Sequence, residues 1–172
     1  MTALASNAPS FDSNHFNYGT GLLVSILLRY PEVGTIKCSQ EQQTLVLKFL
    51  VTKECPFEQL KKELTEALEL FHSIEGRKMN FLSIEKQERE FDIIVVVRDL
   101  RTITKSEINL IVEFIKTKSG KGLIIDEGEL PEDEIIFQDE VINHMLAALR
   151  ANGTDKSLTA LRENGKVLVY NC

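Results

Sequence analysis

The sequence predicts an α+β protein whose core is a ferredoxin-like βαββαβ unit, an antiparallel sheet of four strands with two helices on one face. Between about residues 44 and 125, apolar residues follow strand-like and helical spacing in the order β-α-β-β-α-β. The first and third strands are the most continuously apolar, as the two central strands of this topology should be. With 172 residues, 43% of them hydrophobic, the chain can bury one core without disulfides.

The segment before this core is predicted to hold an arm, a helix and an extra strand. Residues 1–17 are polar and contain neither Lys nor Arg, which indicates a disordered arm and not a secretory signal. A helix is expected over 22–30, closed by Pro31, and its apolar run is far shorter than the roughly 20 residues that span a bilayer. A strand follows at 34–38.

The core elements can be placed from residue spacing and from start signals. The strand at 44–51 is rich in β-branched and aromatic residues, and Pro56 suits the first turn of the helix that follows. Apolar residues recur at three- and four-residue steps along that helix, which ends before Gly76. The remaining expected elements are strands at 79–85 and 91–97, a helix that starts after Thr104 and stops near Gly120, and a short strand at 123–125.

Thr104 and Glu107 have the spacing of a capping box at the start of the second core helix. The Thr104 hydroxyl can accept a hydrogen bond from the Glu107 amide, and the Glu107 side chain can reach back to the Thr104 amide. The helix is therefore expected to begin at this point.

The third core strand is apolar on both of its faces. Ile94 and Val96 point to one side, and Val95 between them points to the other. A strand that is apolar on both faces is normally buried on both, whereas two core helices cover only one face. We therefore predict that the second face is covered from outside the core, by the helix at 22–30, by the C-terminal segment or by a second copy of the chain.

Residues 126–172 are predicted to add a helix and a hairpin to the core at 34–125, within a single domain that starts at residue 18. An acidic stretch at 126–140, with eight carboxylates and no Lys or Arg, leads into a helix at 132–150. The apolar side of this helix is a candidate interface, made by Ile135, Ile142, Met145, Leu146 and Leu149.

The end of the chain carries a turn signal. Asn164-Gly165 lies between two apolar segments and predicts a hairpin of 158–162 and 167–170, because a type I′ turn needs two residues that tolerate positive φ. A short helix at 155–163, capped by Gly165, is the alternative.

The three cysteines, Cys38, Cys55 and Cys172, form no CxxC pair, which argues against soft-metal capture and for reduced thiols. Cys55 precedes a helix, whose N-terminal dipole stabilises a thiolate, so it is a weak candidate for covalent catalysis. Spacing places no base or orienting group beside it, and no metal or cofactor is expected.

Basic residues suggest an anion site at the end of the second core helix. Lys116, Lys118 and Lys121 surround Gly120, where lysine charge and backbone amides could hold a phosphate. The net charge of −6 opposes non-specific binding of nucleic acid, but a local basic patch could still bind it. The residues of that patch would be Arg77, Lys78, Lys116, Lys118 and Lys121.

These observations favour a non-enzymatic protein that acts through protein–protein contacts, as a homo-oligomer or as an accessory or regulatory subunit. One alternative is an RNA- or ribosome-associated factor that uses the basic patch, and another is a domain that senses a small molecule. An enzyme ranks last, because no nucleophile, base and orienting group can be assembled by spacing. A cytoplasmic location without membrane attachment is expected.

Overall fold

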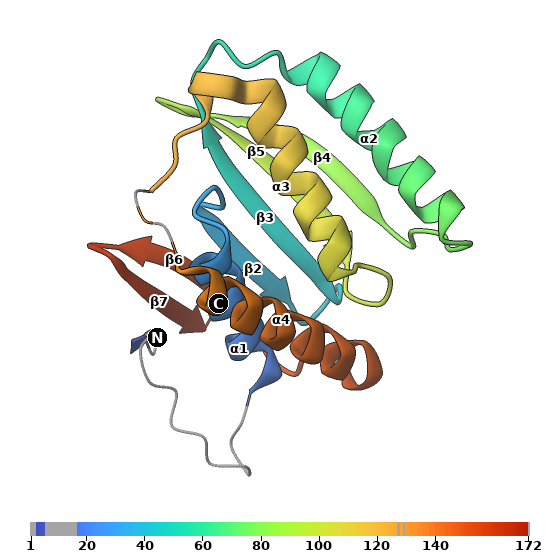
Figure 1. Ribbon diagram of the computed structural model, residues 1–172, viewed down its shortest axis with the longest axis vertical. Coiled ribbons are helices and arrows are strands. Elements are labelled where there is room, and N and C mark those ends of the chain that lie inside the picture. Colours follow the sequence, from blue (N-terminus) through green and yellow to red (C-terminus); the bar gives the residue numbers. More distant parts are fainter. Residues whose placement is uncertain (1–2, 6–16, 127, 129, 172) are drawn as a thin grey trace.

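A seven-stranded antiparallel sheet, in the order β1-β7-β6-β2-β3-β5-β4, forms the back of the molecule (Figure 1). The computed structural model describes residues 3–5, 17–126, 128 and 130–171, so most of the predicted arm at 1–17 lies outside the described residues. The strands are β1 (Ala3–Ala5), β2 (Thr35–Ser39), β3 (Thr44–Val51), β4 (Leu82–Glu88), β5 (Asp92–Asp99), β6 (Leu158–Glu163) and β7 (Lys166–Asn171). The helices are α1 (Tyr18–Arg29), α2 (Phe57–Ile74), α3 (Lys105–Ser119) and α4 (Glu132–Asn152), with a 3-10 turn at Gly120–Gly122.

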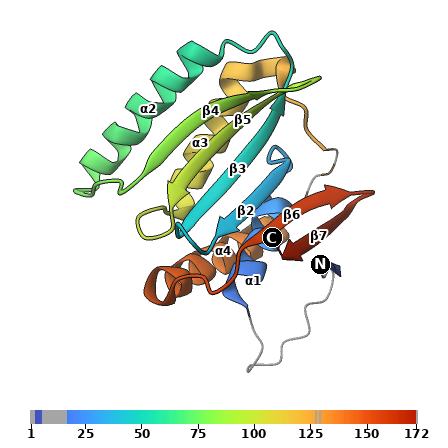
Figure 2. The same ribbon diagram turned by 180° about the vertical axis from the view of Figure 1, so that it is seen from behind.

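All four helices lie on the same side of the sheet (Figures 1 and 2). The α2 and α3 helices cover β3, β5 and β4, whereas α1 covers β2, β6 and β7. The α4 helix packs on α1 and forms an outer layer. Because α1 is held between the sheet and α4, it buries Leu22, Leu23, Ile26 and Leu27, which explains its apolar run.

The predicted ferredoxin-like strand order is not confirmed. The order β3-β5-β4 is as expected, but β2 occupies the edge of β3 at which the fourth core strand was placed. That fourth strand is reduced to one bridge between Leu123 and Val51, flanked by a hydrogen bond of 2.8 Å from the Thr52 amide to the Gly122 carbonyl. A short turn joins β2 to β3, so the loss of chain entropy on pairing them is small and this hairpin occupies the edge.

Several local predictions are confirmed. The strand at 44–51 has the predicted bounds, and the four predicted helices are present with ends shifted by a few residues. Asn164 and Gly165 have φ values of 53° and 76°, which is the turn geometry that the Asn-Gly signal requires. The alternative helix at 155–163 is wrong, since β6 and β7 pair across this turn.

Arg162 ties the C-terminal hairpin to the end of α1. Its Nη2 atom donates a hydrogen bond of 2.8 Å to the carbonyl of Pro31 and another to that of Val33, and its Nε atom lies 2.9 Å from Asp126. Burial lowers the pKa of Arg162, and the carboxylate of Asp126 opposes this shift. The guanidinium therefore supplies hydrogen bonds to carbonyl groups of the loop that follows α1.

The second face of the sheet is not covered by the described part of the chain, which excludes two of the three covers that the sequence suggested. The helices α1 and α4 lie on the same side of the sheet as α2 and α3 (Figure 2). The C-terminal strands β6 and β7 extend the sheet itself. The α1 helix and the C-terminal segment bury their apolar side chains in one continuous core with the inner residues of β2 and β3. A second copy of the chain is the remaining candidate of the three.

Candidate functional site

Two features stand out, a buried cluster of charged side chains and the uncovered face of the sheet. In the first, Arg98 at the end of β5 is fully buried. Its Nη2 atom donates to Glu107 Oε1 at 2.8 Å, and its Nε atom donates to the other oxygen of the same carboxylate. His72 of α2 contacts Glu107 through Nε2, so the cluster joins α2, α3 and β5.

Asp99 completes this cluster at its outer end. Its carboxylate accepts hydrogen bonds from the amides of Phe81 at 2.9 Å and Thr102 at 2.8 Å, and it also contacts Arg98. Burial raises the pKa of Asp99, but the hydrogen bonds from Thr102 and Phe81 and the charge of Arg98 outweigh it and hold this pKa below the ordinary value. The carboxylate therefore stays ionised in the folded chain near neutral pH.

The cluster differs from the prediction made for Glu107. Thr104 Oγ1 accepts a hydrogen bond of 3.2 Å from the Glu107 amide, which confirms the first half of the capping box. The Glu107 side chain, however, turns inward to Arg98 and His72, because a bidentate guanidinium is a stronger partner than a helix amide. Two signals in the sequence pointed to this: His72 continues the apolar helical spacing, and Arg98 continues the inner face of β5.

The buried cluster gives no route for a substrate. Arg98 and Glu107 are both 0% exposed, and His72 is 1% exposed. A catalytic group has to touch its substrate or be reached through a cavity, and these side chains are enclosed by the packed layers of α2, α3 and the sheet. The cluster therefore links α2, α3 and β5. A binding site has to be sought on the surface of the molecule.

The second feature is the uncovered side of the three strands β4, β5 and β3, here called the open face. Val95 lies at its centre, directly beside Lys48 of β3 and Glu85 of β4 in the strand register. These three residues form a cross-strand row, the central row, with a cation at one end and a carboxylate at the other. The remaining residues of the open face are Val46, Leu50, Ser83, Gln87, Ile93 and Val97.

The centre of the open face is apolar and partly accessible. Ile93 and Val97 on β5 and Val46 on β3 are all half-buried, and Val95 at the centre is 8% exposed. Figure 2 shows these strands with no helix in front of them. Central strands usually bury such residues, so an apolar stripe left in this position is typical of a surface that meets another molecule.

The apolar side of α4, predicted as an interface, is largely used inside the chain. Ile142, Met145, Leu146 and Leu149 are buried against α1 and the core, and Ile135 is half-buried. The side that faces solvent instead presents Ile136 and Phe137, each 55% exposed, which the sequence pattern did not single out.

The predicted anion site is occupied by ion pairs. Lys116 lies 3.6 Å from Glu32, and Lys118 is paired with Glu63. The hydrogen bond from Lys118 lowers the pKa of Glu63. The Gly120 amide donates to a carbonyl of its own helix, and Lys121 is exposed.

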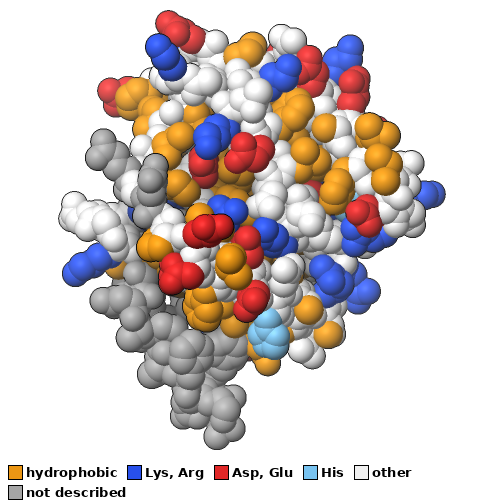
Figure 3. All heavy atoms as spheres, viewed as in Figure 1, with side chains coloured by type: hydrophobic (Ala, Val, Ile, Leu, Met, Phe, Trp, Pro, Cys, Tyr) orange, Lys and Arg blue, Asp and Glu red, His pale blue; other side chains and the backbone are white. Residues whose placement is uncertain are grey.

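The five basic residues proposed for RNA fall into two separate groups. Arg77 follows the end of α2, and its backbone amide donates a hydrogen bond of 2.8 Å to the His72 carbonyl, near the start of α3. Lys116 and Lys118 lie at the other end of α3, a helix of 15 residues and roughly 22 Å. On the side seen in Figure 3, basic and acidic side chains are interspersed.

Cys55 lies where it was predicted, just before α2, and is partly exposed. Its Sγ atom is 3.5 Å from the hydroxyl of Ser119, at the end of α3. Cys38 is fully buried in β2, and Cys172 lies outside the described residues. A hydroxyl is no activating base for a thiol, so the surroundings of Cys55 supply one partner and no catalytic pair.

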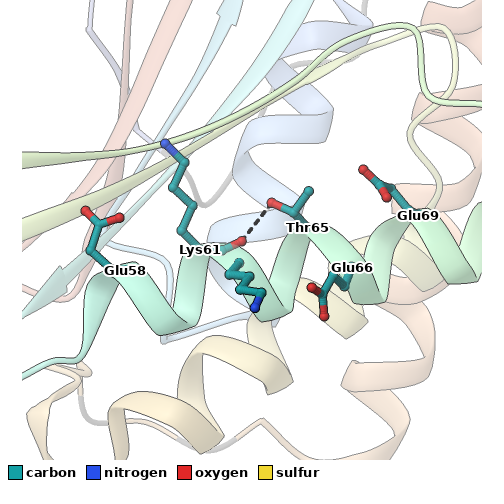
Figure 4. Close-up of a pocket in the computed structure, with 6 residues that line it drawn as sticks. Glu58, Lys61, Thr65, Glu66 and Glu69 are labelled. Carbon is teal, nitrogen blue, oxygen red and sulfur yellow. Dashed lines mark hydrogen bonds between the residues drawn. The ribbon is translucent and has the colours of Figure 1, made fainter.

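A shallow hollow lies on the outer side of α2 (Figure 4). Its lining residues, Glu58, Lys61, Lys62, Thr65, Glu66 and Glu69, all come from one helix. Thr65 donates its hydroxyl to the Lys61 carbonyl within that helix. Charges of both signs along one exposed helix face are typical of a solvated surface.

Comparisons of the chain with known protein families, with curated proteins and with solved structures find no significant match. Within the described residues, no helix combines the length and the apolar character needed to cross a membrane.

Proposed function

We propose that the protein is a non-enzymatic binding component that docks another protein on the open face of its sheet. The observation that carries this proposal is the apolar stripe of Ile93, Val95 and Val97 on a central strand, in which Ile93 and Val97 are half-buried. Burying such residues removes apolar surface from water, which is the main driving force of protein association. The enclosed position of the Arg98–Glu107 pair supports a binding role over catalysis.

The two alternatives have less support. An RNA-binding patch would need Arg77 and Lys78 beside Lys116 and Lys118, and these pairs of residues lie at opposite ends of α3. A small-molecule sensor would need an enclosed site, whereas the hollow on α2 is an exposed surface of charged side chains.

Affinity purification with matched variants tests the proposal. Val97→Asp places a charge on the open face, and Phe137→Asp places the same charge on exposed α4, on the other side of the sheet. The wild-type chain and the Phe137→Asp variant are expected to retain the same protein partner, and Val97→Asp is expected to lose it while keeping its circular dichroism spectrum. Retention of the partner by folded Val97→Asp, or its loss from Phe137→Asp, would contradict the proposal.

A further inference from the structure

We propose that the molecule that covers the open face is a second copy of this chain, placed by a two-fold axis that runs along β5. This inference rests on the proposed function, because it names the partner of the same surface. The argument comes from the central row, in which Glu85, Val95 and Lys48 lie abreast on three neighbouring strands.

The order of charges along this row makes the open face complementary to itself. A two-fold axis parallel to β5, lying between two stacked sheets, exchanges the positions of β4 and β3 and keeps each residue at its height along the strands. Val95 then meets Val95 of the second copy, and Glu85 of each copy meets Lys48 of the other. The dimer therefore gains two ion pairs around an apolar centre.

The other simple orientation is disfavoured by the same residues. A two-fold axis perpendicular to the strands would place Glu85 on Glu85 and Lys48 on Lys48. Like charges facing each other across an interface oppose association. The charge pattern thus selects one of the two face-to-face arrangements, in which the strands of the two sheets run in nearly the same direction.

Both charged groups are free enough to take part. The intrachain partner of Glu85 is Lys61 at 3.4 Å, and the two side chains are 65% and 39% exposed. An exposed pair of this kind contributes little to stability, so the Glu85 carboxylate can exchange it for a partner across the interface. Lys48 is half-buried among apolar neighbours on the open face.

The size of the face predicts a weak dimer. Three strands about 4.8 Å apart, with about seven residues each at 3.3 Å, span roughly 350 Å² on each copy. Stable complexes bury about 800 Å² per partner, so this dimer should be weak and should dissociate on dilution.

Sedimentation of charge-reversal variants tests the arrangement. Wild-type chain is expected to rise from 19.5 kDa toward twice that mass with concentration. Lys48→Glu and Glu85→Lys should each weaken the dimer at least about tenfold, because each replaces both attractive pairs by repulsive ones. An equimolar mixture of the two single variants should recover the wild-type affinity as a heterodimer. In that heterodimer the carboxylate introduced at position 48 of one chain meets the ammonium introduced at position 85 of the other, and the second pair keeps its wild-type residues.

Lys166→Glu is the matched control. Lys166 lies at an exposed position on β7, and β2 and β6 separate that strand from β3, so the same change of charge should leave the dimer intact. Circular dichroism of every variant checks the fold.

The outcomes separate this inference from the proposed function. A wild-type chain that stays monomeric at all concentrations, or a mixture that fails to recover association, would overturn the homodimer. If a monomeric wild-type chain still binds a different protein that Val97→Asp loses, the proposed function stands and only the identity of the partner is wrong. If the chain is monomeric and Val97→Asp retains every partner, both are wrong.

Discussion

Arg98 and Glu107 form a fully buried bidentate pair between the end of β5 and the first turn of α3. Both residues are charged, and each would be costly in the core without the other. The amide of the same Glu107 donates the hydrogen bond to Thr104 that caps α3. The ion pair therefore couples the start of α3 to the end of β5.

Glu107→Gln should therefore destabilise the protein strongly. The variant removes the bidentate carboxylate and leaves Asp99 as the charged partner of the buried Arg98 guanidinium. Breaking a buried pair in this way costs about 3–5 kcal/mol. Urea unfolding followed by circular dichroism measures the change. Glu66→Gln, on the exposed side of α2, is the control and should shift the free energy of unfolding by less than about 0.5 kcal/mol. Equal midpoints for the two variants would show that the buried pair does not support the fold.

Asp99 should make folding stability depend on acid. Its folded pKa lies below the ordinary value of 3.8, so its stabilising contribution is complete above that value and is lost as the pH falls through the folded pKa. Between about pH 5 and pH 2.5, wild-type protein should lose more stability than Asp99→Asn, which has no such group to protonate. Asp155→Asn, at an exposed position, should follow the wild-type curve. A curve for Asp99→Asn that parallels the wild-type curve would contradict this.

The two faces of β5 should respond differently to the same charge. Val96 is 0% exposed beneath the helices, and Val96→Asp should prevent folding, because an unpaired buried charge costs as much as the whole stability of a domain. Val95→Asp lies on the open face beside Lys48 and should fold with a loss of about 1–2 kcal/mol. Thermal melting of both variants checks this. A folded Val96→Asp, or an unfolded Val95→Asp, would mean that the assignment of the faces is wrong.

Cys55 should react with iodoacetamide on the folded protein while Cys38 is protected. Cys38 is 0% exposed within β2, and Cys55 is partly exposed before α2. Peptide mass spectrometry at mildly acidic and neutral pH gives the two rates. In denaturant the difference should disappear, which controls for the intrinsic reactivity of each thiol. Faster labelling of Cys38 on folded protein would show that β2 opens readily and that Cys55 is not the accessible thiol.

The sequence alone was enough for elements whose signals lie within a few residues. The strand Thr44–Val51 follows from its β-branched and aromatic residues, and α2 follows from apolar positions repeated at helical spacing. The hairpin around Asn164 and Gly165 follows from the positive φ that a two-residue turn requires. In each case, the local conformational preference and the final structure agree.

Only the tertiary structure decided which segments pair and which face each helix covers. The edge of β3 could accept either Thr35–Ser39 or the chain near Leu123, and both are apolar enough to compete. Spacing places Arg98 and His72 on inward-facing positions, but not within reach of Glu107, because their elements are separate along the chain. The uncovered sheet face also depends on tertiary packing, since α4 packs on α1 and both helices lie on one side of the sheet. These choices depend on contacts between residues distant in sequence, and a local pattern does not contain them.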